Sequence, residues 1–110
     1  MRLANTEPVP GEIRLVDFGI AGKARPVLIL YFPTDDAARA LAVVLPLTSQ
    51  IRGGEGEFYL GKPKFLPKKS AVNLQGIAAI DRTKIGKLYG RIPDTQFRQI
   101  KACLSEFLDL

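Results

Sequence analysis

Residues that could carry chemistry are few in this sequence, and their types restrict what the chain can do. The 110 residues include no histidine and a single cysteine, Cys103, so no disulfide can form within the chain. Zinc sites built from Cys and His, the Ser-His-Asp triad and Cys-His catalysis are therefore excluded. Any reaction must use arginine, lysine, serine, threonine, tyrosine, glutamine or carboxylates, and no metal-ligand cluster is recognisable.

Two of these residues, Arg25 and Thr48, stand at matching places beside apolar runs. Arg25 precedes the run 26–32, and Thr48 follows the run 40–47. If the two runs form neighbouring antiparallel strands, both side chains reach the same end of the fold. A guanidinium can hold two oxygens of an anion, and a hydroxyl can donate to the same charge. The pair predicts a site that stabilises negative charge; the alternatives are a surface charge and a turn hydroxyl.

The pattern of apolar residues predicts a mainly β fold. Apolar or alternating runs, bounded by turns rich in Gly and Pro, are typical of strands. Pro46 is expected to end its strand or mark a bulge, and Gly76 to form a bulge within its strand. Because strands this short cannot hide their edges in a flat sheet, we expect a small curled barrel. The predicted strands cover residues 12–18, 26–32, 40–47, 58–60, 70–80 and 85–92, with a turn at 81–84.

The last segment of the chain has helical spacing. Asp94 can cap a helix, and apolar residues then recur along one face, which predicts a C-terminal amphipathic helix. Cys103 beside this face is expected to pack. We expect one domain over residues 1–110, with residues 1–10 as a loose arm. The apolar face consists of Phe97, Ile100, Leu104, Phe107 and Leu108.

The net charge of +5 is concentrated in the middle of the chain. Residues 62–91 carry eight lysines and arginines and one acid, Asp81. One interpretation is a surface that faces a polyanion, either a phosphate backbone or an acidic partner; the other is solvated loops and strand edges. No apolar run approaches the roughly 20 residues of a membrane-spanning helix. The lone thiol and the lack of an evident export signal favour a cytoplasmic protein without a membrane partner.

Four segments, taken in order, resemble one known family. They are PGEIRLVDF (10–18), ARPVLIL (24–30), VLPLTSQ (44–50) and KKSAVNLQGIAAIDRTKIGKLYGRIPD (68–94). Each segment is weakly specific alone. Their order over one short chain resembles the MazF/PemK-type toxins of bacterial toxin–antitoxin modules, and the resemblance covers nearly all of residues 10–110.

The resemblance implies an SH3-like barrel of the CcdB/MazF/PemK type, a homodimer and a cognate acidic antitoxin. It also implies cofactor-free, metal-independent cleavage of single-stranded RNA at short sequences, by attack of the ribose 2′-hydroxyl on the adjacent phosphate. Carried over by position, the family's catalytic arginine falls on Arg25 and its catalytic threonine on Thr48. RNA supplies its own nucleophile, so the protein needs mainly to position the phosphate and stabilise charge. Arg25 and Thr48 suit that task.

Two departures from the family pattern affect the expected activity. The family often has an acid in the loop before the arginine, whereas residues 19–24 contain none and the nearest carboxylate is Asp17. Many members also have a Gln and an Arg where this chain has Gly76 and Ala78. Gln75 is one residue away, and a bulge could re-aim it. Altered base specificity, lower activity and an inactive relative all stay open.

The expected RNA-binding residues flank the predicted pair and follow the basic segment. Ser49 assists catalysis or only caps the turn, and Arg52 in the glycine-rich loop contacts phosphate or nothing. Three aromatic residues, Phe58, Tyr59 and Phe65, either stack on RNA bases or belong to the core. The predicted RNA-binding set is Ser49, Arg52, Lys68, Lys69, Gln75 and Arg82.

Two other functions compete with the endoribonuclease. One is a non-enzymatic toxin on the same barrel, of the gyrase-inhibitor CcdB type, which acts through a C-terminal segment bearing tryptophan. This chain contains no tryptophan, so that function ranks lower. The other is a catalytically inactive module that binds RNA or the antitoxin, which the two departures favour.

Overall fold

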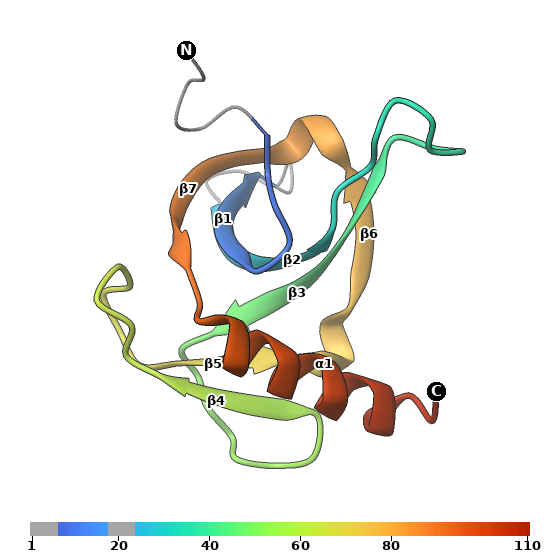
Figure 1. Ribbon diagram of the computed structural model, residues 1–110. Helices are drawn as coiled ribbons and strands as arrows, with labels where there is room; N and C mark the ends of the chain where they lie inside the picture. Colours follow the sequence, from blue (N-terminus) through green and yellow to red (C-terminus); the bar gives the residue numbers. More distant parts are fainter. Residues whose placement is uncertain (1–6, 18–23) are drawn as a thin grey trace.

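The computed structural model describes residues 7–17 and 24–110. Within these residues the chain forms a curled β-sheet followed by one α-helix that lies against it (Figure 1). The elements are β1 (Glu12–Asp17), β2 (Ala24–Tyr31), β3 (Leu41–Thr48), β4 (Glu57–Gly61), β5 (Ser70–Asn73), the 3₁₀ turn η1 (Leu74–Gly76), β6 (Ala78–Asp81), the 3₁₀ turn η2 (Arg82–Lys84), β7 (Ile85–Arg91) and α1 (Asp94–Phe107).

Strand β3 organises the sheet. The strands follow the order β4-β5-β3-β2-β1-β7, and all pairs are antiparallel. One edge of β3 pairs with β2, and its other edge pairs first with β6 and then, through Leu47 and Thr48, with β5. Because η2 joins β6 to β7, which pairs with β1, the sheet curls into a small barrel (Figure 1). The prediction of a mainly β barrel with a C-terminal helix is confirmed.

The sheet carries an apolar cluster on each face. Val27 and Ile29 of β2 belong to the cluster inside the barrel, together with buried residues of β1 and β3. Leu28, between them, belongs to a larger cluster on the opposite face, where α1 packs. Successive residues of a strand point to opposite faces, so β2 and β3 are buried on both sides. This explains why their sequences are continuously apolar.

The first turn of α1 differs from the prediction. Pro93 occupies the N-cap position without a side-chain cap hydrogen bond, and Asp94 is the first helical residue. The prediction of Asp94 as the N-cap is therefore wrong. Its carboxylate lies 3.6 Å from the Arg91 guanidinium instead.

The apolar face of α1 is narrower than predicted. Ile100 and its neighbours on that face, Phe97 and Leu104, are buried. Leu108 lies beyond the helix and is 39% exposed, and Cys103 is exposed as well, so the predictions that these two residues pack are wrong. Cys103 precedes Leu104 by one residue, and one residue turns the side chain about 100° around a helix, away from the sheet.

Residues 70–80 do not form one strand. The turn η1 separates β5, which pairs with the end of β3, from β6, which pairs with its beginning. A Cβ on Gly76 would lie 2.8 Å from Asn73 Nδ2 and 3.0 Å from Pro46 Cγ, so the turn needs glycine where it approaches β3. The expected bulge at Gly76 is thus a 3₁₀ turn.

Pro46 does not end β3, which continues to Thr48. The proline stands opposite Val27 of β2. On the other edge of β3 it lies between the stretch paired with β6 and the stretch paired with β5. Proline has no N–H to donate, and this gap in the pairing accommodates it.

The segment before β1 is tied to the barrel from residue 7 onward. The Val9 N–H donates to Glu12 Oε1 at 2.8 Å, and the buried Arg14 guanidinium donates to the same oxygen at 2.9 Å. Arg14 also donates to the Gly86 carbonyl of β7. Residues 1–6 of the expected loose arm lie outside the described residues.

Candidate functional site

Arg25 and Thr48 lie at the same end of two neighbouring antiparallel strands. Val27 of β2 pairs with Pro46 of β3. Arg25 lies two residues before Val27, and Thr48 lies two residues after Pro46. Because successive side chains of a strand alternate between its two faces, Arg25 and Thr48 lie on the same face as Val27 and Pro46, at the end of the sheet where the β2–β3 pairing stops. The predicted neighbouring antiparallel strands are confirmed.

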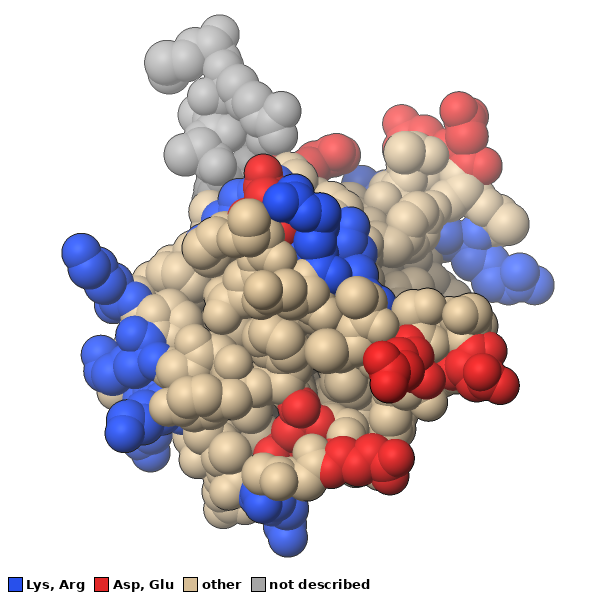
Figure 2. All heavy atoms as spheres, turned by 60° about the horizontal axis from the view of Figure 1, so that its bottom comes forward, with Lys and Arg blue, Asp and Glu red and all other residues tan. Residues whose placement is uncertain are grey.

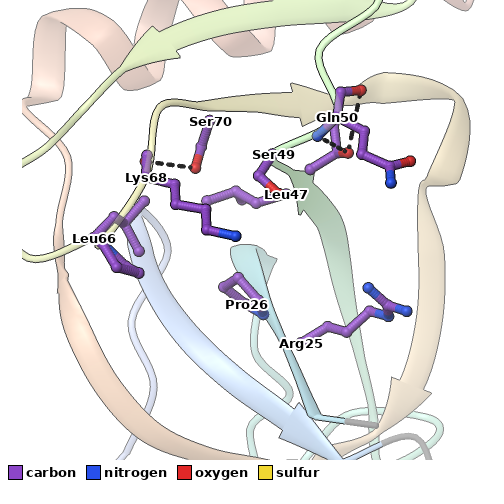
Figure 3. Close-up of a pocket in the computed structure, with 10 residues that line it drawn as sticks. Arg25, Pro26, Leu47, Ser49, Gln50, Leu66, Lys68 and Ser70 are labelled. Atoms are coloured by element: carbon purple, nitrogen blue, oxygen red, sulfur yellow. Dashed lines mark hydrogen bonds between the residues drawn. The ribbon is translucent and has the colours of Figure 1, made fainter.

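A cavity of about 410 Å³ opens at this end of the sheet. Its apolar part comes from β2, β3 and the β4–β5 loop, and its polar groups come from these segments, from the start of the β3–β4 loop and from β5 (Figure 3). Of the predicted site residues, it brings together Arg25, Thr48, Ser49 and Lys68. The lining consists of Arg25, Pro26, Leu47, Thr48, Ser49, Gln50, Leu66, Pro67, Lys68 and Ser70.

The Thr48 hydroxyl is held in a turn. Its Oγ1 accepts a hydrogen bond from the Gln50 N–H at 3.1 Å and lies 3.5 Å from the Gln50 carbonyl oxygen (Figure 3). A hydroxyl has one donor and two acceptor positions. The short bond uses an acceptor position, and the long contact to the carbonyl is at the limit of a hydrogen bond. The turn thus orients Thr48 while its proton remains available to a bound anion.

Arg25 carries an exposed guanidinium at the start of β2. Among the described residues, it makes no ion pair with a carboxylate. An arginine that is not engaged by an acid can offer its planar fork to a phosphate. The loop before it, where the family often has an acid, falls on residues 18–23 and lies outside the described residues.

Lys68 supplies a second cation to the cavity. Figure 3 shows the Arg25 and Lys68 side chains on either side of Pro26. The buried Ser70 hydroxyl donates to the Lys68 carbonyl oxygen at 3.1 Å, which fixes the backbone of the loop at this point. Two cations and a hydroxyl around one open cavity favour an anionic ligand.

Arg82 lies at the other end of β3, because it follows β6, whose Asp81 pairs with Leu41. Its guanidinium is 3.5 Å from the Glu7 carboxylate and 3.8 Å from that of Asp35, and it lies over the Phe32 ring. These contacts tie η2 to the segment before β1 and to the β2–β3 loop. The structure does not bring Arg82 to the cavity.

The other predicted RNA-binding residues lie outside the cavity lining. The backbone N–H groups of Arg52 and Gly53 donate to Glu57 Oε1, which leaves the Arg52 side chain exposed on the β3–β4 loop. Gln75 in η1 packs against Gly56, where a Cβ would lie 2.7 Å from Gln75 Cγ. Lys69 is exposed next to Lys68.

The basic residues of segment 62–91 lie in three places. Lys62, Lys64, Lys68 and Lys69 lie on the β4–β5 loop, and none of them makes an ion pair within the described part of the chain. Figure 2 shows Lys and Arg side chains along the left edge of the molecule, the side on which this loop lies in Figure 1. We call these four residues the loop lysines.

The second place is η2, which follows Asp81 at the end of β6. The N–H and hydroxyl of Thr83 donate to the Asp81 carboxylate and hold its pKa below the usual value. The Arg82 guanidinium lies beside the carboxylates of Glu7 and Asp35.

The third place is β7, where Lys87 lies over the Tyr89 ring and Arg91 faces Asp94. The charge excess of residues 62–91 therefore does not form a single surface, and only its loop lysines adjoin the cavity.

Sequence reasoning missed several lining residues. Gln50 supplies the backbone groups that orient Thr48, and Ser70 fixes the Lys68 backbone. The signal for Ser70 was its position at the end of the basic loop.

Within residues 7–17 and 24–110, no group of three Cys, Asp or Glu side chains could hold a metal ion, and the one α-helix is too short and polar to cross a membrane.

The family model of the PemK-like, MazF-like toxins of type II toxin–antitoxin systems matches residues 9–108. The chain belongs to this family. The PemK/MazF-like chain is 29% identical over 103 residues to the probable endoribonuclease MazF5 of Mycobacterium tuberculosis, with 93% of this chain and 94% of the relative covered. The family resemblance read from the four sequence segments is confirmed.

Solved MazF structures share the fold of this PemK/MazF-like chain. The M. tuberculosis toxin MazF-mt6 matches with a TM-score of 0.75 at 24% identity, over 90% of this chain and 97% of that one. A MazE–MazF structure from Deinococcus radiodurans matches with a TM-score of 0.72 at 20% identity, over 94% and 97%. At these identities the likeness establishes the architecture, so the role of each residue must be argued from the site.

Proposed function

We propose that this chain is the toxin of a toxin–antitoxin module and an endoribonuclease that cuts single-stranded RNA at short sequences without a metal ion. The observation that carries the proposal is the open cavity at the end of β2 and β3, whose lining includes Arg25, Thr48 and Lys68. Family membership and the relative named as a probable endoribonuclease support the same activity.

The reaction uses the ribose 2′-hydroxyl of the substrate as nucleophile. Its oxygen attacks the adjacent phosphorus while its proton passes to water; the bond to the 5′-oxygen breaks, and this oxygen takes a proton from water as it leaves. The products are a 2′,3′-cyclic phosphate and a 5′-hydroxyl. Arg25 holds the non-bridging oxygens through its fork, and Thr48 donates its proton to the same developing charge. Lys68 neutralises a neighbouring phosphate.

The other predicted RNA-binding residues are expected to contact nucleotides on either side of the scissile phosphate. Ser49 lines the cavity beside Thr48, and Lys69 extends the charge of Lys68 along the loop. Arg52 and Gln75 lie on segments next to β4 and reach nucleotides further from the cut. Arg82 is omitted from this set because acids and a backbone carbonyl engage it.

Primer extension on a long RNA treated with the purified chain tests the activity. Cleavage should persist in excess chelator, leave a cyclic phosphate and stop when the ribose at the cut is 2′-deoxy. Loss of cleavage in chelator would contradict metal independence. If the wild type cuts no RNA, a gyrase supercoiling assay and RNA-binding measurements decide between the non-enzymatic toxin and the inactive binding module.

We also propose a homodimer and an acidic antitoxin that lies over the loop lysines. Four lysines without ion pairs in the described structure favour an acidic partner. The D. radiodurans relative was solved as a MazE–MazF structure. Sedimentation at micromolar concentration should give a species of twice 12.1 kDa, and antitoxin affinity should fall with added salt.

A further inference from the structure

A row of residues crosses four strands at the candidate site. Thr48 of β3 pairs with Ala71 of β5, and Ala71 pairs with Tyr59 of β4. On the other side of β3, Val27 of β2 pairs with Pro46, and Arg25 and Thr48 each lie two residues from this pair and so on the same face. Residues directly opposite each other across antiparallel strands point to the same face of the sheet. Tyr59 therefore shares a face with Arg25 and Thr48.

The spacing of this row matches the scale of a nucleotide chain. Neighbouring strands lie about 4.8 Å apart, so Tyr59 is about 10 Å from Thr48 across the sheet. The two ends of the row, Arg25 and Tyr59, are exposed, whereas Ala71 between them is fully buried. A single-stranded ligand whose phosphate is held at Thr48 has a neighbouring base within reach of Tyr59.

Tyr59 differs from the other two aromatic residues of this region. Phe58 and Phe65 pack against the apolar cluster under α1, and the Phe65 ring lies on Gly90 of β7. The Tyr59 side chain is 56% exposed, and the preceding and following residues of β4 point to the opposite face. An exposed large aromatic ring next to a polar site is available for stacking.

The surroundings of Tyr59 suit a phosphate backbone. The chain leaves β4 two residues after Tyr59 and enters the loop that carries Lys62 and Lys64, both exposed. Proteins that bind single strands combine such a basic track with aromatic rings on which bases stack. The turn η1, which carries Gln75, borders the same strand through the bond from the Leu74 N–H to the Gly56 carbonyl.

We propose that Tyr59 is the stacking platform for a base next to the scissile phosphate and that it helps determine which nucleotide is accepted there. This inference rests on the proposed function, because it takes RNA as the ligand of the Arg25–Thr48 pair. An exposed tyrosine can also serve only to favour the strand. A substitution that removes the ring but keeps high β propensity distinguishes stacking on a base from a role in the strand alone.

The experiment measures binding of a short labelled RNA by fluorescence anisotropy. The RNA spans the mapped cut and carries 2′-deoxyribose there, so it stays intact; if the wild type makes no cut, the unmodified RNA is used directly. Tyr59→Thr removes the ring but keeps a residue of high β propensity, and it should weaken binding about tenfold. Tyr59→Phe keeps the ring and should bind within twofold of the wild type. Tyr31→Ala, at an exposed tyrosine at the other end of β2, is the matched control.

A second arm replaces single bases of the RNA by abasic sites. If Tyr59 stacks on one base, that abasic site should weaken the wild type but not Tyr59→Thr, and all other positions should affect both proteins equally. Equal affinity of Tyr59→Thr and wild type, or equal losses at every abasic position, would overturn the proposal. This experiment measures binding and not cleavage. An inactive wild type or an active Arg25→Ala protein would therefore refute the proposed function without deciding the role of Tyr59.

Discussion

Arg25 should contribute more to cleavage than any other side chain of the cavity. Removing a preorganised donor to a developing oxyanion typically costs about 100-fold or more, so Arg25→Ala should lose at least that much. Arg25→Lys should restore little, because an ammonium cannot replace a bidentate fork. Initial rates on a fluorogenic RNA measure both. Arg39→Ala, at an exposed arginine of the β2–β3 loop, serves as the control; equal rates for Arg25→Ala and wild type would refute the site.

Thr48 should matter less than Arg25, because a neutral hydroxyl stabilises charge less than a guanidinium does. We expect Thr48→Ala to slow cleavage on the order of tenfold. Thr48→Ser keeps the hydroxyl and its bond from the Gln50 N–H, so it should stay near wild type. Thr34→Ala removes a similar turn bond, to the Asp36 N–H, far from the cavity and controls for the turn itself. A Thr48→Ala enzyme slower than Arg25→Ala would reverse the assigned roles.

Within the β4–β5 loop, two adjacent lysines should differ in effect. Lys68 lines the cavity and its backbone is fixed by Ser70, whereas Lys69 lies outside the lining. Lys68→Ala should weaken RNA binding several-fold at physiological salt, and Lys69→Ala should have a smaller effect. Because each phosphate contact to a single strand adds about 0.7 to the slope of log affinity against log salt, titrations with salt measure both. Equal losses would mean that the loop acts only through its net charge.

The turn η1 depends on a glycine in the loop before β4. Gly56 has φ +89°, and a Cβ there would meet the Gln75 side chain at 2.7 Å. Gly56→Ala should therefore lower the free energy of unfolding by about 1–2 kcal/mol. Gly54→Ala, where nothing lies within 4 Å of the added atom, should change it little. Urea unfolding distinguishes the two; equal stability of both variants would contradict this close contact.

The elements with uniform patterns were predictable, and those that depend on distant partners were not. The runs around Val27 and Leu45 and the spacing of Ile100 along α1 indicated their structures directly. The break after Asn73 was not predictable, because it depends on β3 accepting two different partners along one edge. From the sequence, Arg25 and Thr48 could be placed at the same end of the sheet, because their strands are consecutive in the chain. The Thr48–Ala71–Tyr59 row could not be predicted, because its register is set by a loop with no strand pattern.

At the level of the whole barrel, Arg82 should affect stability rather than RNA. It connects η2 with the segment before β1 and with the β2–β3 loop, at the opposite end of β3 from the cavity. Exposed ion pairs contribute about 0–1 kcal/mol, and its contact with the Phe32 ring adds to this. Arg82→Ala should lower the thermal midpoint by a few degrees and keep cleavage near wild type, with Lys84→Ala as the control. A large loss of RNA affinity in a folded Arg82→Ala protein would show that the far end also binds substrate.

The β3–β4 loop divides the cavity lining into two parts of the chain. Gly53 and Gly54 within it have no atoms near their Cβ positions. The lining residues 25–50 lie before these glycines and the lining residues 66–70 lie after them. A chain cut between these glycines becomes two pieces that depend on each other, since the first leaves an edge of β3 bare and the second lacks the central strand of the sheet. A cell could make either piece alone without harm. On the proposed function, both pieces together should be needed to cut RNA, because each carries only part of the cavity lining.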